Sequence, residues 1–345
     1  MNGKLFFIAI LAIFISTLAF GQKTVVKTTS TLPTPTPTVA PTPTPTPVTL
    51  EGILTEAEKQ TQNYRQAFNS LLAEETKTFE EYNKDGEAKK RRSVESNFLV
   101  YQSTKNENFI TEYRNVVKVD GKAVGDSNKR AEDFFENVLK STSAESELDK
   151  ILEESTRYDK TLNISGFTLY QSPILTAYIR PAFDFRLNGR ETFNGRTVYS
   201  INYQQKSKSP YVLFNEKVAF TDKIYINYEI ELPKQIKEPN ALLRGKLWID
   251  AETFEVLREE LEQTIQPKGA TNPLVVLRTE LEYQKNEPGL VTPKKITLTY
   301  YEVRRKDEQL TVQKDTVATF EYTKFTKSDV EVKSGDVNSS ETPKP

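Results

Sequence analysis

The side chains that most often carry out chemistry in proteins are unevenly represented in this sequence. Its 345 residues include no His and no Cys, whereas Asp and Glu together number 48. Thiolate nucleophiles, Ser-His-Asp triads and the usual zinc, copper and haem sites need imidazole or thiolate groups, so the composition excludes them. Any acid–base catalysis would depend on Asp, Glu or Lys.

Adjacent carboxylates are the remaining candidates for catalysis. Glu80-Glu81 and Glu153-Glu154 are examples, but neighbouring residues of a strand point to opposite faces, and neither pair lies in a recognisable catalytic setting. The sequence also lacks a phosphate-binding glycine loop and an EF-hand pattern. We therefore expect a protein that is not an enzyme, with no catalytic residues, no metal site and no cofactor. A carboxylate-dependent hydrolase is the enzymatic alternative.

Two residues near position 250 are candidates for binding. Trp248 is the only tryptophan, and on its strand it points away from its two apolar neighbours. Its ring either packs on a sheet or lines a hydrophobic cleft. Arg258 precedes Glu259 and Glu260. It belongs either to a solvated strand face or to the mouth of a cleft, where it would contact a lipid phosphate or a partner carboxylate.

The charge pattern limits the partners that the protein can attract. A formal net charge of −1 gives no general attraction to nucleic acid, so no nucleic-acid partner is expected. The densest basic run, Lys89 to Arg92, follows an Asp85-Gly86 turn signal. This run is either a solvated turn or a point of contact with an anionic membrane surface.

Helical periodicity marks the beginning and the middle of the chain. Thr55 followed by Glu58 is a capping-box pattern and predicts a helix from that point. Further helices are predicted over residues 130–139 and 148–158, with a short helical segment over 174–179. Strands are predicted over residues 76–83, 92–102 and 109–118, the first two forming a hairpin.

Beyond Pro181 the apolar residues alternate with a period of two. Strands are expected over 197–203 and 224–232 and then repeatedly between 257 and 322, with a loop over 205–215. Strands with one apolar and one polar side predict an antiparallel sheet. The element order predicts an α+β fold, with a large curved antiparallel sheet and helices gathered on one face. The apolar side forms either an ordinary core or a ligand cleft, and its cleft candidates are Tyr199, Ile201, Tyr203, Ile226, Tyr228 and Ile230.

The two ends of the chain differ in composition from the part between them. Lys4, the apolar run from Leu5 to Phe20, and Gly21 predict a signal peptide over residues 1–21, cleaved after Gly21. An uncleaved anchor is the alternative, although 16 residues span only about 24 Å of the roughly 30 Å bilayer core. Residues 22–49 are rich in Pro and Thr and predict a disordered linker that acts as a spacer or stalk. We expect one domain over 50–327 and a disordered tail over 328–345.

A resemblance to a known family appears in the second half of the chain. The run from Gly245 to Asp250, followed by Thr253 and by Arg258 to Glu260, resembles a pattern of the outer-membrane lipoprotein-sorting (LolA-like) superfamily. The turn from Val119 to Lys122 and the final run from Phe320 to Phe325 are also similar. The resemblance implies a half-barrel, an unclosed barrel around helices packed on its concave face, whose apolar hollow holds acyl chains.

Two functional hypotheses follow from the residues and the resemblance. In the first, an exported, non-enzymatic protein binds an apolar or amphipathic ligand in the half-barrel cleft, with a lipid or a lipoprotein acyl chain as its partner. In the second, the core is filled and the outer surfaces recognise another envelope protein, as in a stress-sensing module. The secreted or periplasmic location is common to both hypotheses.

Overall fold

The computed structural model describes residues 48–68, 71–106, 109–158, 170–214, 216, 223–228, 236, 240–267, 272–286, 289–306 and 309–327. The predicted signal peptide, nearly all of the predicted linker and the predicted tail lie outside these residues. They therefore stay predictions.

The described chain contains three α-helices and thirteen strands. The helices are α1 (Leu50–Phe68), α2 (Ser127–Leu139) and α3 (Ala144–Ser155), and two 3₁₀ turns are η1 (Pro173–Leu175) and η2 (Arg180–Ala182). The strands are β1 (Leu71–Tyr82), β2 (Ala88–Gln102), β3 (Ile110–Val119), β4 (Lys122–Ala123), β5 (Phe183–Phe193), β6 (Arg196–Gln205), β7 (Val212–Phe214), β8 (Ile226–Tyr228), β9 (Asn240–Asp250), β10 (Val256–Gln266), β11 (Leu274–Lys285), β12 (Val291–Lys306) and β13 (Gln309–Lys327). No helix within these ranges is both long and apolar enough to cross a bilayer.

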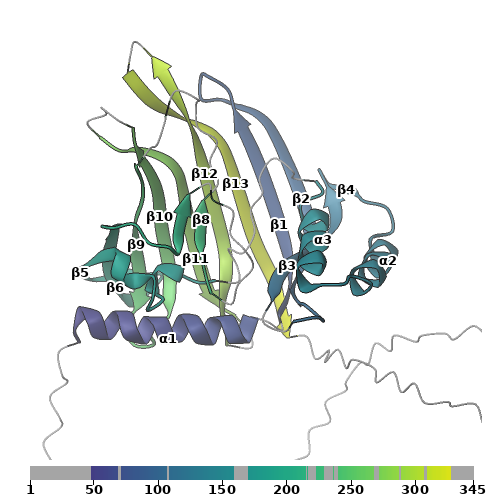
Figure 1. Cartoon of the computed structure of the whole chain (residues 1–345), viewed down its shortest axis with the longest axis horizontal. Coiled ribbons are helices and arrows are strands. Elements are labelled where there is room, and N and C mark those ends of the chain that lie inside the picture. Colours follow the sequence, from purple (N-terminus) through teal and green to yellow (C-terminus); the bar gives the residue numbers. More distant parts are fainter. Residues whose placement is uncertain are drawn as a thin grey trace, which may run out of the picture. The chain divides into compact units, whose positions relative to one another are not determined.

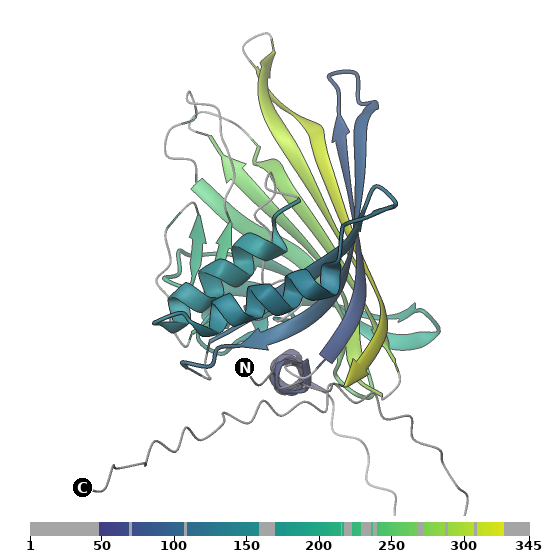
Figure 2. The same cartoon turned by 90° about the vertical axis from the view of Figure 1, so that its right-hand side faces the viewer.

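One large sheet organises the described chain (Figure 1). Its eleven strands follow the order β4-β3-β2-β1-β13-β12-β11-β10-β9-β6-β5, and every neighbouring pair is antiparallel. The sheet does not close into a barrel, because β4 and β5 remain at its two edges. Figure 2 shows the strong twist that a sheet of this size acquires. The predicted α+β class and the open antiparallel sheet are confirmed.

The main hydrophobic core lies on one face of this sheet, which we call the inner face. Alternate residues of nine strands, from β2 to β5 in the sheet order, contribute to it. Ile53, Leu54 and Ala57 of α1 and Ile174 and Leu175 of η1 are buried against it. The inner face is therefore covered by α1 and by the segment from residue 170 to residue 182.

Helices α2 and α3 pack on the opposite face, which we call the outer face. Tyr113 of β3 and Tyr101 of β2 form a separate cluster with Val138 of α2 and Ile151 of α3. In the register of β2 and β3, Leu99 pairs with Tyr113, whereas the inner-face residue Phe98 pairs with Arg114. Leu99 and Tyr113 therefore point to the outer face. Figure 2 shows the two helices side by side. The expectation that all helices gather on one face therefore holds for α1 alone.

The first helix begins earlier than its sequence pattern predicts. Thr49, and not Thr55, caps α1: its side chain accepts a hydrogen bond from the Gly52 amide at 3.1 Å. Thr55 lies inside the helix. The sequence Thr49-Leu50-Glu51-Gly52 offers no glutamate at the third helical position, so the true cap lacks the pattern that marks a capping box.

The region between β6 and β9 also differs from its prediction. The expected long strand over 224–232 is described only as β8, which pairs in parallel with β7 in a separate two-stranded sheet. β7 lies within the expected loop over 205–215. Residues 229–235 lie outside the described residues.

Candidate functional site

The predicted cleft residues of β6 lie together on the inner face. Tyr199, Ile201 and Tyr203 are 3%, 0% and 2% exposed and belong to the main core. Ile226 of β8 joins the same core. The side chain of Tyr228 and the whole of Ile230 lie outside the described residues.

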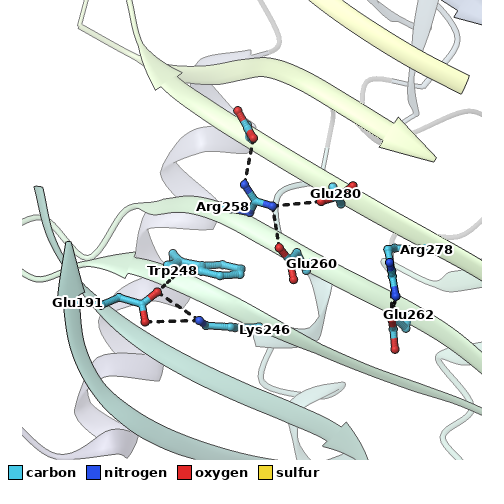
Figure 3. A network of polar contacts seen from close by, with 9 residues as sticks. Glu191, Lys246, Trp248, Arg258, Glu260, Glu262, Arg278 and Glu280 are labelled. Atoms are coloured by element: carbon cyan, nitrogen blue, oxygen red, sulfur yellow. Dashed lines mark hydrogen bonds and ion pairs between the residues drawn. The ribbon is translucent and has the colours of Figure 1, made fainter. Parts of the chain in front are cut away.

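Trp248 lies on the outer face and is not brought together with these residues. It packs against Val198 and Leu257 in a separate cluster. Lys246 Nζ lies 4.2 Å from the ring centroid and the Arg258 guanidinium 5.2 Å from it. The indole N–H donates to the carboxylate of Glu191 (Figure 3). The ring is therefore held between two cations, an arrangement that exploits the negative face of an indole.

Arg258 is also on the outer face, where its charge is already compensated. Its guanidinium lies 2.6 Å from Glu260, 3.1 Å from Glu280 and 3.1 Å from Glu282 (Figure 3). Its side chain is 21% exposed. Three carboxylates around one cation leave an excess of negative charge, which does not favour a lipid phosphate at this residue.

The charge network continues along the same face. Glu262 lies between Arg244, at 2.7 Å, and Arg278, at 2.5 Å. Burial acts to raise the pKa of Glu262, but hydrogen bonds from Arg278 and Arg244 outweigh it and hold the pKa below its ordinary value. The network links β9, β10 and β11 across the sheet.

The basic run from Lys89 to Arg92 lies on the first residues of β2. Lys90 pairs with Glu81 at 3.1 Å and Arg91 with Glu80 at 3.6 Å. The side chains of both basic residues are more than half exposed. Exposed pairs of this kind contribute little to stability.

Glu259 is the residue of the Arg258-Glu259-Glu260 run that faces inward. It is 3% exposed, in contrast to the solvated face predicted for the run. Its carboxylate accepts hydrogen bonds from Ser172 Oγ at 2.7 Å and from Tyr203 OH at 2.8 Å. Burial raises the pKa of Glu259, and the two hydrogen bonds act against that rise. A carboxyl group is therefore held among apolar side chains with neutral donors.

Gly245 makes the contact between Tyr203 and Glu259 possible. Gly245 pairs with Tyr203 on one side and with Leu261 on the other. A β-carbon added at Gly245 would lie 2.4 Å from Tyr203 OH and 2.1 Å from the carbonyl oxygen of Glu260. Glycine is therefore required here so that the tyrosine ring can cross β9 and reach β10.

Three further polar groups on the inner face have no hydrogen-bond partner among the described residues. They are Gln263 Oε1 on β10, and Thr279 Oγ1 and Tyr283 OH on β11. All three side chains are at most 4% exposed. Thr279 pairs with Leu261, between Glu259 and Gln263 on β10, so the groups lie on adjacent strands. We call Glu259, Gln263, Thr279 and Tyr283 the inner polar patch.

Tyr283 connects this patch to α1. Its ring meets Tyr64 of α1 edge to face, with centroids 6.1 Å apart. Burial, followed by the charge of Glu259, raises the pKa of Tyr283 well above its ordinary value. The hydroxyl therefore stays protonated and can donate a hydrogen bond as well as accept one.

A second buried polar group lies toward the β3 edge of the inner face. Arg114 Nε lies 2.8 Å from Glu75, and its terminal nitrogen lies 2.7 Å from Glu112. The three side chains are at most 4% exposed. Burial acts to lower the pKa of Arg114, but the two carboxylates outweigh it and hold the pKa well above its ordinary value. One buried guanidinium therefore pairs with two buried glutamate side chains.

Within the described residues, no cluster of three or more Asp or Glu side chains is arranged to hold a metal ion. Sequence reasoning did not identify Tyr283, Thr279 or Gln263. Gly245 within a strand pattern was the available signal, because such a glycine often marks a close approach of another group.

Comparison with solved structures finds chains that align with most of this one at low sequence identity. A DUF1329 family protein from Desulfovibrio piger aligns with 13% identity over 82% of this chain and 95% of that one, at a TM-score of 0.30. A putative outer membrane lipoprotein-sorting protein domain from Vibrio parahaemolyticus aligns with 10% identity over 81% and 94%, at 0.33. A LolA superfamily protein from Nitrosomonas europaea aligns with 9% identity over 80% and 94%, at 0.30.

No family model matches the sequence, and no curated protein matches it.

Proposed function

We propose that this chain is an exported, non-enzymatic protein that binds an amphipathic ligand on the inner face of its sheet. The polar group of the ligand would bond to the inner polar patch. Its apolar part would lie against the aromatic and aliphatic side chains of β6, β10 and β11. The observation that carries the proposal is the set of three buried, unpartnered atoms on Gln263, Thr279 and Tyr283.

The cost of these atoms supports a bound partner. A buried polar group without a hydrogen bond costs about 1–3 kcal/mol, so three of them cost roughly 3–9 kcal/mol. That is comparable with the whole stability of many domains, which is about 5–15 kcal/mol. Either a ligand or ordered water would remove this cost, and the experiment below separates the two.

The chemistry of the patch favours a neutral polar group. Gln263 presents an oxygen acceptor, and Thr279 and Tyr283 present hydroxyls. Glu259 adds a carboxyl group whose hydrogen bonds come from neutral side chains. An anionic headgroup would meet no compensating cation at these four residues. A hydroxyl or amide group, such as that of an acylated amine or a monoacylglycerol, would be accepted.

Extraction of the purified protein tests the proposal. The full chain is expressed with its own residues 1–21, and the exported protein is purified without detergent and extracted with organic solvent for mass spectrometry. A stoichiometric neutral amphiphile is the expected result. Thr279→Val should reduce its occupancy several-fold, whereas Thr297→Val on the outer face of β12 should leave it unchanged. An extract without lipid, together with a Thr279→Val protein more stable than the parent, would contradict the proposal.

A second candidate function is an envelope interaction module with a filled core. The burial of the inner-face side chains favours this second function, since Tyr199, Ile201 and Tyr203 are at most 3% exposed. In that case the inner face serves only stability, and recognition occurs on the outer face or at the sheet edges. The stability increase in Thr279→Val without any extracted lipid is the outcome that this second function predicts.

Export is part of the proposal and rests on residues 1–21, which lie outside the described residues. The intact mass of the secreted protein tests it. A mature chain that begins at Gln22 supports cleavage after Gly21. A mass that retains residues 1–21 would support the anchored alternative.

A further inference from the structure

The two edges of the large sheet differ in how their backbone groups are satisfied. At the β3 edge, the Arg114 amide donates to Ser155 Oγ at 3.2 Å, and the Val124 amide donates to the Val117 carbonyl at 3.0 Å. The Arg130 guanidinium donates to the Val116 carbonyl. Side chains of α2 and α3 therefore occupy backbone groups that would otherwise accept another strand.

The β5 edge is open. β5 bonds to β6 on one side, and it is the last strand of the sheet on the other. Among the described residues, the backbone hydrogen bond of β5 outside its ladder with β6 is at its first residue, where the Phe183 amide donates to the Arg180 carbonyl. Figure 1 shows the strand at the margin of the sheet. An edge of this kind is a template on which another extended chain can pair.

The side chains of this edge alternate in character over its first five residues. Phe183, Phe185 and Leu187 lie on the inner-face side and contact the main core, the last two remaining partly exposed. Asp184 and Arg186 point to the other side and are exposed. A strand added here would meet apolar side chains on one face and charged side chains on the other.

The charge on that second side is positive. Asp184 is already paired with Lys206 at 2.8 Å. The exposed Arg186 has no ion pair or hydrogen bond to the described residues. Over these first five residues Lys206 and Arg186 therefore face one carboxylate, Asp184, and the charge of Arg186 is left uncompensated.

We propose that the β5 edge, over Phe183 to Leu187, binds an extended peptide segment of a partner protein as a twelfth strand. The segment would alternate apolar residues, which pack beside Phe185 and Leu187, with acidic residues, which face Arg186. Main-chain hydrogen bonds would supply affinity, and the alternation would supply specificity. This site is independent of the ligand proposed for the inner face.

A peptide fits this edge better than a second copy of the chain. The ladder with β6 shifts register between Leu187 and Gly189, and such a bulge bends the strand. Uninterrupted pairing is therefore limited to about five residues. That length buries far less than the roughly 1,200–2,000 Å² of a stable interface between two folded proteins.

A synthetic ten-residue peptide of alternating valine and glutamate, labelled with fluorescein, tests the proposal on the full mature chain. Saturable fluorescence anisotropy and slowed hydrogen exchange at residues 183–187 are expected. The same peptide with lysine in place of glutamate should not bind. Arg186→Glu should weaken binding about tenfold, because an attraction is replaced by a repulsion of similar size. Arg305→Glu, a matched reversal on the exposed part of β12, should leave binding unchanged.

Backbone methylation of the peptide tests strand pairing itself. Two isomers carry N-methyl groups on either all valines or all glutamates. Only one row of peptide amides can face β5, so one isomer should lose binding and the other should keep it. Equal binding of both isomers would overturn the proposal, as would exchange protection elsewhere on the chain or no binding at millimolar peptide. A dimer that protects β5 without peptide would assign the edge to a second copy and would also overturn it.

Discussion

Replacement of Gly245 by alanine is the sharpest test of how the inner face is built. The added β-carbon would lie 2.1 Å from the Glu260 carbonyl oxygen and 2.5 Å from Tyr203 Cζ, so both the backbone at Glu260 and the tyrosine ring must shift relative to β9. Overpacking of this kind costs about 1–3 kcal/mol. If the ring moves, Glu259 also loses its 2.8 Å hydrogen bond, at a further cost of about 1–3 kcal/mol.

We therefore expect Gly245→Ala to lower the free energy of unfolding by about 4 kcal/mol, which corresponds to a decrease in Tm of about 8–16 °C. Urea denaturation followed by the fluorescence of Trp248, three residues along the same strand, measures the loss. Gly52→Ala in α1 is the matched control. Its new β-carbon meets only the flexible Thr49 Oγ1, at 3.2 Å, so the change should be neutral or slightly stabilising.

A double-mutant cycle identifies the cause of the loss. In a Tyr203→Leu background the ring and its hydroxyl are absent but the approach to the Glu260 carbonyl remains, so Gly245→Ala should cost about 1–3 kcal/mol less than in the parent chain. Additive losses in the two single variants would refute the proposed contact between Gly245 and Tyr203. A loss below about 1 kcal/mol in Gly245→Ala alone would refute the overpacking argument itself.

Three further predictions concern buried charge. The raised pKa of Glu259 means that the folded state binds the carboxyl proton more tightly than the unfolded state, so stability should fall as the pH rises from the pKa of the unfolded state toward that of the folded state. Glu259→Gln should remove this slope in urea titrations at several pH values, and an unchanged slope would contradict the assignment. Arg258→Ala should leave three glutamates facing one another, costing about 1–3 kcal/mol at pH 7, and added salt should recover part of the loss in the same assay. Arg114→Met should cost about 3–5 kcal/mol, because Glu75 and Glu112 lose their buried cation, and a near-neutral result would show that the carboxylates are neutral when folded.

The sheet and much of the core could be predicted because alternation of apolar residues is a local property of the chain. Tyr199, Ile201 and Tyr203 share one face in the sequence pattern and in the structure. The same rule places Trp248 on the opposite side from its apolar neighbours, which the structure reproduces. The sequence could not predict which face of each strand would pack in the main core, because that depends on strands that pair at long range.

The inner polar patch escaped prediction for a related reason. Glu259 lies between Arg258 and Glu260, and a run of three charged residues is typical of a solvated strand. Only the pairing of β9 with both β6 and β10, which places Gly245 between Tyr203 and Leu261, shows that the middle residue is buried and bonded. The Arg114 group is similar, because its glutamates come from different strands. A charged residue in a sequence is predicted to be exposed unless the partner that compensates its charge is known.

The position of β13 in the sheet has a consequence for how the protein is made. β1 pairs with β13 from Leu71 opposite Lys327, and this is the ladder through which the strands of the first half meet those of the second. The final described strand, β13, therefore joins two parts of the sheet, since it pairs with β1 on one side and with β12 on the other. Until residues 309–327 are in place, β1 pairs only with β2 and β12 only with β11, so each lacks one of its two neighbours. The two parts of the sheet can therefore join only after β13 has been made, and this late, long-range pairing is expected to be a slow step of folding.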